Sequence, residues 1–129
     1  ESNMAISRIM EKIRKHLASY YGCTRFGYIW VREQEKAKQQ HYHLILFMDA
    51  NKIQHPSRLI AWIEKRWMAH GHPKPYTPKN CYLRLARDDS RAFSKVFYRA
   101  SYLAKVRGKG YTRPSVNRYG TSRLRVKEI

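Results

Sequence analysis

The sequence predicts an α+β domain in which helices pack on one face of a central antiparallel sheet. Three segments have apolar residues at helical spacing, and two neighbouring segments are rich in aromatic and β-branched residues. Hydrophobic residues make up 43% of the 129 residues, which is enough for one packed core, so we expect a single domain over residues 1–129. The expected order, α-β-β-α-β-α, matches a ferredoxin-like or split βαβ plan that lacks its first strand or has it displaced.

The first helix is expected over residues 2–22. Ser2 or Asn3 can cap its start, and Gly22 can end it. Its apolar residues recur every three or four positions and predict the buried side, which consists of Ile6, Ile9, Met10, Ile13, Leu17 and Tyr20.

A β-hairpin and a second helix are expected next. Residues 24–35 and 41–49 predict two strands because of their aromatic and β-branched content, and the polar segment 36–40 connects them. An amphipathic helix follows over residues 57–71, which ends at Gly71 and turns four residues inward: Leu59, Ile60, Ile63 and Trp67.

Residues 81–87 alternate between apolar and polar side chains and predict a third strand. A third helix is expected over residues 88–108, with acids at its start and a basic residue before its final glycine, as the helix dipole prefers. The arm at residues 108–129 is strongly basic and is either an anion-binding arm or a poorly ordered end, in which residues 121–126 can add an edge strand. The core side of the third helix is predicted to be Phe93, Val96, Phe97, Ala100, Leu103 and Ala104.

The composition indicates a polyanionic partner. Twenty-seven Lys and Arg stand against nine Asp and Glu, a formal net charge of +18, and ten Tyr and three Trp accompany them. Positive charge attracts phosphates and aromatic rings stack on bases, so the mixture suits single-stranded nucleic acid. A membrane partner is not expected, because the sequence has no lipidation motif and no apolar run of membrane-spanning length. Cys23 and Cys81 lie outside any metal-binding spacing and predict buried, reduced thiols in a cytosolic protein.

His41 and His43 are the first candidate site residues. One residue separates them, so on a strand both side chains point to the same face. Two imidazoles held side by side on a strand make half of a divalent-metal site. A second pair, His70 and His72, lies at a predicted helix end where nothing fixes both rings on one face, and we interpret it as a surface cap.

Two glutamates can complete the metal site. If residues 36–40 form the connection, Glu35 lies across from His41 and Glu33 across from His43, on the histidine face. A set of two histidines and a glutamate with open positions suits Mn²⁺ or Mg²⁺ held for catalysis. A register slip of one residue would move the glutamates to the other face. Alternatively, both glutamates form surface ion pairs with the basic neighbours Arg32, Lys36 and Lys38.

The third helix offers a nucleophile. Tyr102 and Lys105 are three residues apart and share a helix face, on which Tyr98 also lies one turn earlier. A tyrosine on a basic helix can attack a phosphate to give a phosphotyrosine ester, with Lys105 offsetting the phosphate charge or favouring the phenolate. The alternative for Tyr102 is a half-buried packing residue.

Together, "HYH" on a strand and "YLAK" on a later helix resemble the HUH endonuclease superfamily, with the motif order of its replication-initiator branch. Residues 25–125 look most like inovirus-type gene-two replication endonucleases of filamentous phages and prophages. The resemblance implies a site-specific nickase that initiates rolling-circle replication through a covalent 5′-phosphotyrosine intermediate. His41 and His43 would be the metal ligands, Glu33 the acidic ligand, Tyr102 the nucleophile and Lys105 its helper.

The resemblance also implies partners and a location. These are single-stranded DNA at an origin or hairpin, a separate helicase or host replication machinery, and the cytoplasm of a bacterial host. Tyr98 would be a second tyrosine in a two-tyrosine mechanism, which Ser101 disfavours because such pairs usually carry a lysine between them. The alternatives are a non-catalytic RNA- or DNA-binding module and an HUH transposase. The DNA-binding residues expected from charge and proximity in sequence are Arg32, Arg99, Arg107, Lys109 and Arg113, with Tyr111 stacking on a base.

Overall fold

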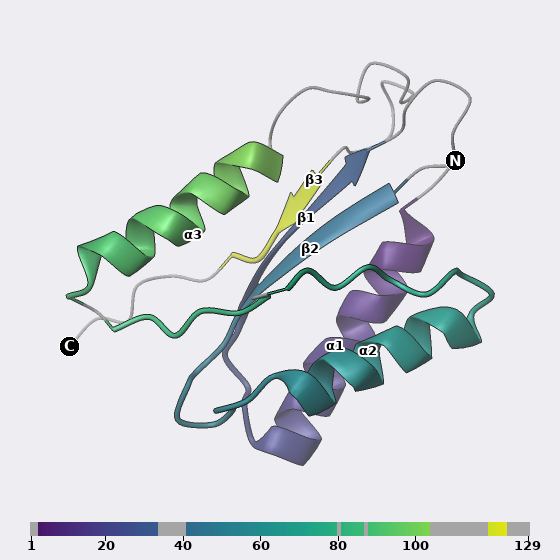
Figure 1. Ribbon diagram of the computed structural model, residues 1–129. Helices are drawn as coiled ribbons and strands as arrows, with labels where there is room; N and C mark the ends of the chain where they lie inside the picture. The colour runs from purple at the N-terminus through teal and green to yellow at the C-terminus, as the bar shows by residue number, and fades with distance from the viewer. Residues whose placement is uncertain (1–2, 34–40, 80, 87, 104–118, 124–129) are drawn as a thin grey trace.

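The fold is α+β, as the sequence predicts. The computed structural model describes residues 3–33, 41–79, 81–86, 88–103 and 119–123, with the backbone alone at residues 33, 102 and 103 (Figure 1). Within these residues, the three strands form one antiparallel sheet in the order β2-β1-β3. The elements are α1 (Met4–Tyr21), β1 (Gly27–Glu33), β2 (His41–Phe47), α2 (Ser57–Ala69), α3 (Ser90–Leu103) and β3 (Tyr119–Thr121).

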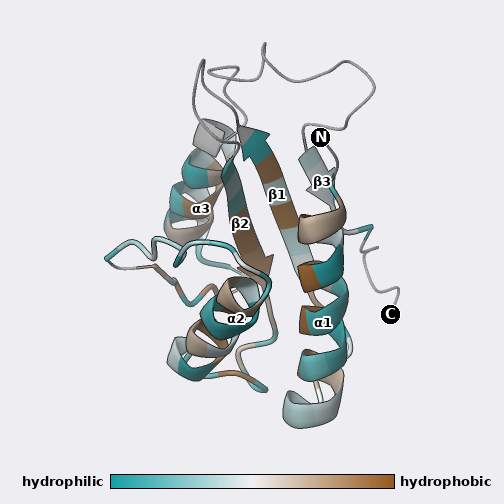
Figure 2. Ribbon diagram, turned by 90° about the vertical axis from the view of Figure 1, so that its right-hand side faces the viewer, coloured by the Kyte–Doolittle hydropathy of each residue, from teal (hydrophilic) through white to brown (hydrophobic). Residues whose placement is uncertain are grey.

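The helices lie on both sides of the sheet. Helices α1 and α2 lie on one side and α3 on the other, as Figures 1 and 2 show from two directions. The expectation of helices on a single face is therefore wrong for α3. None of the helices in the described part of the chain combines the length and apolarity that a membrane span requires.

The main core forms between α1, α2 and one face of the sheet. Five of the six residues predicted for the inner side of α1 are buried, and Ile13 and Leu17 are fully inaccessible. Tyr20 is the exception: it is the penultimate residue of α1, and 63% of its surface is exposed. Leu59 of α2 and Trp30 of β1 complete this cluster, which the apolar colouring of the inner helix surfaces reflects (Figure 2).

Both ends of α1 are defined by local chemistry. Gly22 adopts a left-handed conformation with φ of 64°, and the N–H of Cys23 donates to the Leu17 carbonyl over 2.8 Å, which ends the helix. Asn3 flanks the start, but its side chain makes no capping hydrogen bond. The Asn3 side chain instead accepts hydrogen bonds from the sheet: from Tyr42, and from Arg32 beside it.

The hairpin register differs from the expected one by two residues. Glu33 pairs with His41 and Val31 pairs with His43, so Glu33, not Glu35, lies opposite His41. Side chains alternate with a period of two, so a two-residue shift leaves every side chain on its predicted face. The connection itself, predicted over residues 36–40, lies outside the described residues.

The third strand comes from the C-terminal arm. Residues 81–86 form no strand, which corrects the prediction for 81–87. Instead β3 pairs with the free edge of β1, with Gly120 opposite Trp30. A Cβ at Gly120 would collide with the Trp30 indole, so this position needs glycine for the close approach of the two strands. The edge strand expected at 121–126 thus begins two residues earlier, and residues 124–126 lie outside the described part.

Among the described side chains of α3, the large aromatic rings are exposed and smaller apolar residues are the ones covered. Ala92 is buried, and Val96 and Ala100 are half-buried. Phe93 and Phe97, both predicted to face the core, are 61% and 65% exposed. The apolar stripe of α3 is wider than the surface that covers it, so these two rings remain at its edge.

Candidate functional site: the histidine face of the sheet

The histidine face is the face of the sheet turned away from α1 and α2. It includes His41, His43 and Ile45 of β2, whereas the alternate residues of β2 pack on the core. His41 is exposed and His43 is half-buried, beside the buried Val31. The face is thus apolar along most of its length and becomes polar at the end where β2 begins.

The register brings a carboxylate residue to the two histidines. Glu33 lies directly opposite His41, and such neighbours in an antiparallel pair have Cα atoms about 4.5–5.5 Å apart. Two imidazoles and one carboxylate are a donor set that fits a divalent cation such as Mn²⁺ or Mg²⁺. Within the residues whose side chains are described, no three potential ligands cluster, and the Glu33 carboxylate and all of Glu35 fall outside that set.

The tyrosine-bearing end of α3 lies at the same end of the molecule. The chain leaves α3 beside the tip of β1 and the start of β2, in both views (Figures 1 and 2). Tyr102 is the penultimate residue of α3, and α3 lies on the side of the sheet that the histidines face. Tyr98, one turn earlier, is 72% exposed, and Lys105 lies beyond the described residues.

Arg32 does not belong to a phosphate-binding surface, contrary to the sequence prediction. Its side chain is fully buried on the core face, and its Nη1 donates to Asn3 Oδ1 over 3.2 Å. The Tyr42 hydroxyl donates to the same oxygen over 3.1 Å. Burial raises the pKa of Tyr42, and the neighbouring Arg32 charge partly opposes that rise. Arg32 is therefore a structural residue that joins the start of α1 to the sheet.

Three basic residues of α3 lie on the flank that also contains Tyr98 and Tyr102. Arg99 was expected to bind DNA and is exposed. Sequence reasoning missed Arg91 and Lys95, which are exposed at preceding turns of the same flank. Their spacing of four residues was visible in the sequence and could have identified them. The other expected binding residues lie outside the described part: Arg107, Lys109, Tyr111 and Arg113.

The second histidine pair is not a metal site. His70 is the residue that ends α2, and its Nε2 lies 2.6 Å from the Lys12 ammonium nitrogen. The His72 ring stacks on Trp67 with centroids 4.0 Å apart. The two rings have different partners, as their interpretation as surface groups at a helix end predicts.

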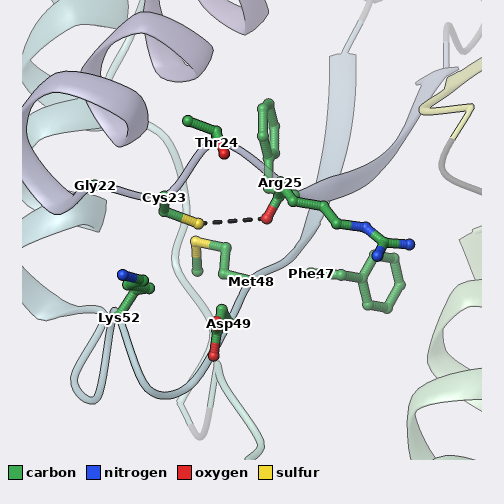
Figure 3. A pocket seen from close by; sticks show the side chains of 9 residues that line it. Gly22, Cys23, Thr24, Arg25, Phe47, Met48, Asp49 and Lys52 are labelled. Atoms are coloured by element: carbon green, nitrogen blue, oxygen red, sulfur yellow. Dashed lines mark hydrogen bonds between the residues drawn. The ribbon is translucent and has the colours of Figure 1, made fainter. Parts of the chain in front are cut away.

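A hollow at the far end of the hairpin is separate from the candidate site. It has a volume of about 350 Å³ and is lined by the loop between α1 and β1 and by the end of β2 with the loop that follows, including Cys23, Phe47 and Asp49 (Figure 3). The Cys23 thiol is buried there and donates to the Arg25 carbonyl over 3.4 Å. Phe47 is six residues along β2 from His41, a distance of about 20 Å. Both cysteines are free, as expected, although Cys81 is only half-buried.

Comparison with known proteins corrects the family expected from the motifs. No curated protein and no solved structure matches the chain. The family model of the YagK/YfjJ C-terminal domain matches residues 4–122, which includes the histidines, Glu33 and both helical tyrosines. The assignment to the replication-initiator branch of the HUH superfamily is therefore wrong. The chain belongs to the YagK/YfjJ C-terminal domain family.

Proposed function

We propose that this domain is a metal-dependent endonuclease and strand transferase for single-stranded DNA, with Tyr102 as the nucleophile. The observation that supports the proposal is the common location of the Tyr102 end of α3 and the His41 end of the sheet. His41, His43 and Glu33 would hold the cation. A bound divalent cation supplies Lewis-acid polarisation of the scissile phosphate. This proposal depends on the residues and their arrangement and not on the corrected family resemblance.

The reaction balances without any further reactant. The Tyr102 phenolic oxygen forms a bond to phosphorus, the bond from phosphorus to the 3′ oxygen breaks, and the proton ends on the released 3′-hydroxyl. The 5′ end remains on the protein as a phosphotyrosine ester. Attack by a 3′-hydroxyl on that ester reverses the chemistry and joins two strands. Lys105 would offset the negative charge that gathers on the phosphate during attack.

The products suggest a biological setting. A free 3′-hydroxyl is the group that a polymerase extends, so a nick of this kind would start rolling-circle replication. Strand separation would then require a separate helicase, with the reaction taking place in the cytoplasm of a bacterial cell. The net charge of +18 supports an encounter with DNA driven by electrostatic attraction.

The decisive experiment detects the covalent intermediate. Purified protein is incubated with Mn²⁺ and labelled single-stranded oligonucleotides, and SDS-resistant adducts are separated by gel electrophoresis. We expect an adduct with the wild type and none with Tyr102→Phe, since only the attacking oxygen is lost. Tyr98→Phe is the matched control one turn away on α3 and should retain the adduct. An adduct that persists in Tyr102→Phe but disappears in Tyr98→Phe would assign the nucleophile to the other turn.

A second variant tests the cation site. His41→Ala should abolish Mn²⁺-dependent cleavage and should weaken Mn²⁺ binding, measured by the loss of free-ion signal in electron paramagnetic resonance. His55→Ala, an exposed histidine in the loop before α2, should change neither quantity. Unaltered Mn²⁺ binding in His41→Ala would refute the ligand assignment.

The second candidate function is a non-catalytic nucleic-acid-binding module. The exposed aromatic side chains of α3 favour it, because stacking and charge alone can bind single strands. The adduct experiment separates the two functions, since a binding module would shift the oligonucleotide in a native gel without any covalent product.

A further inference from the structure

Two phenylalanines on α3 are exposed in a way that needs an explanation. Phe93 and Phe97 have 61% and 65% of their surface accessible, and neighbouring large apolar side chains on the surface usually mark a binding site. Their rings are nearly parallel, with an angle of 23° between planes and centroids 6.4 Å apart. They therefore present consecutive flat apolar surfaces along the helix.

The same helix surface has a hollow beside these rings. Its volume is about 400 Å³, and its described lining residues all belong to α3: Phe93, Ser94, Phe97, Tyr98 and Ser101. The lining combines three aromatic rings with three hydroxyl groups, one of them on the Tyr98 ring. Such a surface offers both stacking faces and hydrogen-bonding groups to a flat, polar ligand.

The basic charge of α3 indicates which class of ligand binds to this surface. Helix α3 contains Arg91, Lys95 and Arg99 and no acidic residue. These three basic residues are spaced four apart, so they form one row along the helix. At 3.6 residues per turn this row borders the Tyr98 edge of the aromatic surface and lies on the opposite flank of α3 from Phe93 and Phe97. A second copy of the chain packed on this surface would bring two helices without acidic residues together, which like-charge repulsion opposes. A single strand offers both phosphates, which a basic helix attracts, and flat bases, on which exposed rings stack.

We infer that the outer surface of α3 is a stacking platform for unpaired bases of single-stranded DNA, with Phe93 and Phe97 as its rings. The inference rests on the proposed function for the identity of the substrate. Phe97 is five residues before Tyr102, about 7 Å along the helix axis. Positions 97 and 102 lie on different sides of α3 at this spacing, so the platform would hold bases of the strand less than two helical turns from Tyr102. The positive charge of Arg91, Lys95 and Arg99 would attract the phosphates of the same strand.

The test measures affinity for a single-stranded oligothymidine by fluorescence anisotropy, with the Tyr102→Phe background to prevent covalent capture. The double variant Phe93→Ala/Phe97→Ala should bind at least tenfold more weakly, as expected when two bases no longer stack. Tyr76→Ala is the matched control, since Tyr76 is 87% exposed but lies in the loop after α2, and it should bind as the parent does. Circular dichroism should show the same fold for all three proteins, because the substituted rings are exposed.

Two further measurements separate stacking from charge. An oligonucleotide of equal length made of abasic sites should bind the parent and the double variant with equal affinity, because it has phosphates but no bases. The dependence of log affinity on log salt should keep its slope in the phenylalanine variant. It should become shallower in Arg91→Gln/Lys95→Gln/Arg99→Gln, by about 0.7 for each phosphate that the variant no longer neutralises.

Several outcomes would overturn the inference. Equal oligothymidine affinity of parent and double variant excludes a platform, and an equal loss on abasic DNA shows that the rings act on something other than bases. A change of oligomeric state with unaltered DNA affinity would identify a protein-docking surface instead. The failure of the nuclease proposal is distinguishable, because absence of an adduct in the otherwise wild-type protein leaves the base-dependent affinity difference intact.

Discussion

The two faces of the sheet differ in what covers them. On the core face, α1 and α2 enclose side chains such as Leu17 and Leu59, which are almost completely inaccessible to solvent. On the histidine face, the described part of α3 contributes a narrow stripe of small residues and leaves the rings of Phe93, Phe97 and Tyr98 in solvent. The first face holds the fold together by apolar burial, whereas the second presents polar and aromatic groups at the surface.

Because of this difference, the residues that stabilise the fold are not the residues of the candidate site. A strand alternates its side chains between two faces, so β1 and β2 supply both the core and the candidate site without sharing residues between them. His41 and His43 point away from the core, and Tyr42 between them points into it. Substitutions at the site should therefore alter activity with little loss of stability, and core substitutions should do the reverse.

The largest expected effect on stability is a core deletion. Leu17→Ala removes a fully buried side chain of α1 and should lower the free energy of unfolding by about 2–5 kcal/mol, since a cavity remains. Phe97→Ala removes a larger side chain but one that is mostly exposed, and it should change this free energy by less than about 0.5 kcal/mol. Urea denaturation followed by circular dichroism measures both values.

Equal losses in the free energy of unfolding for Leu17→Ala and Phe97→Ala would contradict the contrast between a packed core face and an open histidine face. A loss of several kcal/mol in Phe97→Ala would mean that the phenylalanine packs within a second core. The same result would also remove the basis of the stacking platform, because the rings would be structural.

Most of the core face could be predicted from the sequence, because helical spacing decides which residues of α1 and α2 turn inward. The histidine face could be predicted in part. The period of two in a strand placed both histidines and Glu33 on one face even though the register was wrong. The burial of Phe93 and Phe97 was predicted wrongly, because an apolar stripe does not reveal how wide the surface opposite it is.

The origin of the third strand could not be predicted from alternation. Residues 81–86 alternate as a strand should, but alternation does not determine which segment pairs with the sheet, and residues 119–121 pair with β1 instead. Arg32 was placed at the surface because of its charge. Only the three-dimensional structure shows that the Arg32 guanidinium is buried on the core side, where it and the Tyr42 hydroxyl donate to the same Asn3 oxygen.

An intermediate effect is expected where the core face contains polar groups. Asn3→Ala removes the oxygen that accepts from both Arg32 and Tyr42, and it should lower the free energy of unfolding by about 1–3 kcal/mol because buried donors lose a partner. Asn51→Ala, in the exposed turn after β2, is the matched control and should cost much less. Equal midpoints of denaturation for the two variants would show that Asn3 is dispensable to the core.

The smallest effect concerns the outer rim of the α1–α2 layer. The His16 ring stacks on Trp62 with centroids 4.0 Å apart, and Arg66 lies over the same indole. Burial, and secondarily the Arg66 charge, lower the pKa of His16 below its ordinary value of 6.5. The unfolded chain therefore binds a proton at this residue more readily than the folded one. Stability from this source is complete above pH 6.5 and declines as the pH falls through the lower folded pKa.

Titration of the His16 imidazole by nuclear magnetic resonance measures this pKa directly. Arg66→Gln removes the smaller of the two causes, so the pKa should rise part of the way towards its ordinary value while remaining below it, because burial persists. His16→Gln should reduce the loss of stability as the pH falls below 6.5, relative to the wild type. A pKa of 6.5 or above for His16 in the folded protein would mean that burial does not disfavour its charged form. The difference in solvent exposure between the two faces of the sheet would then be confined to the inner core.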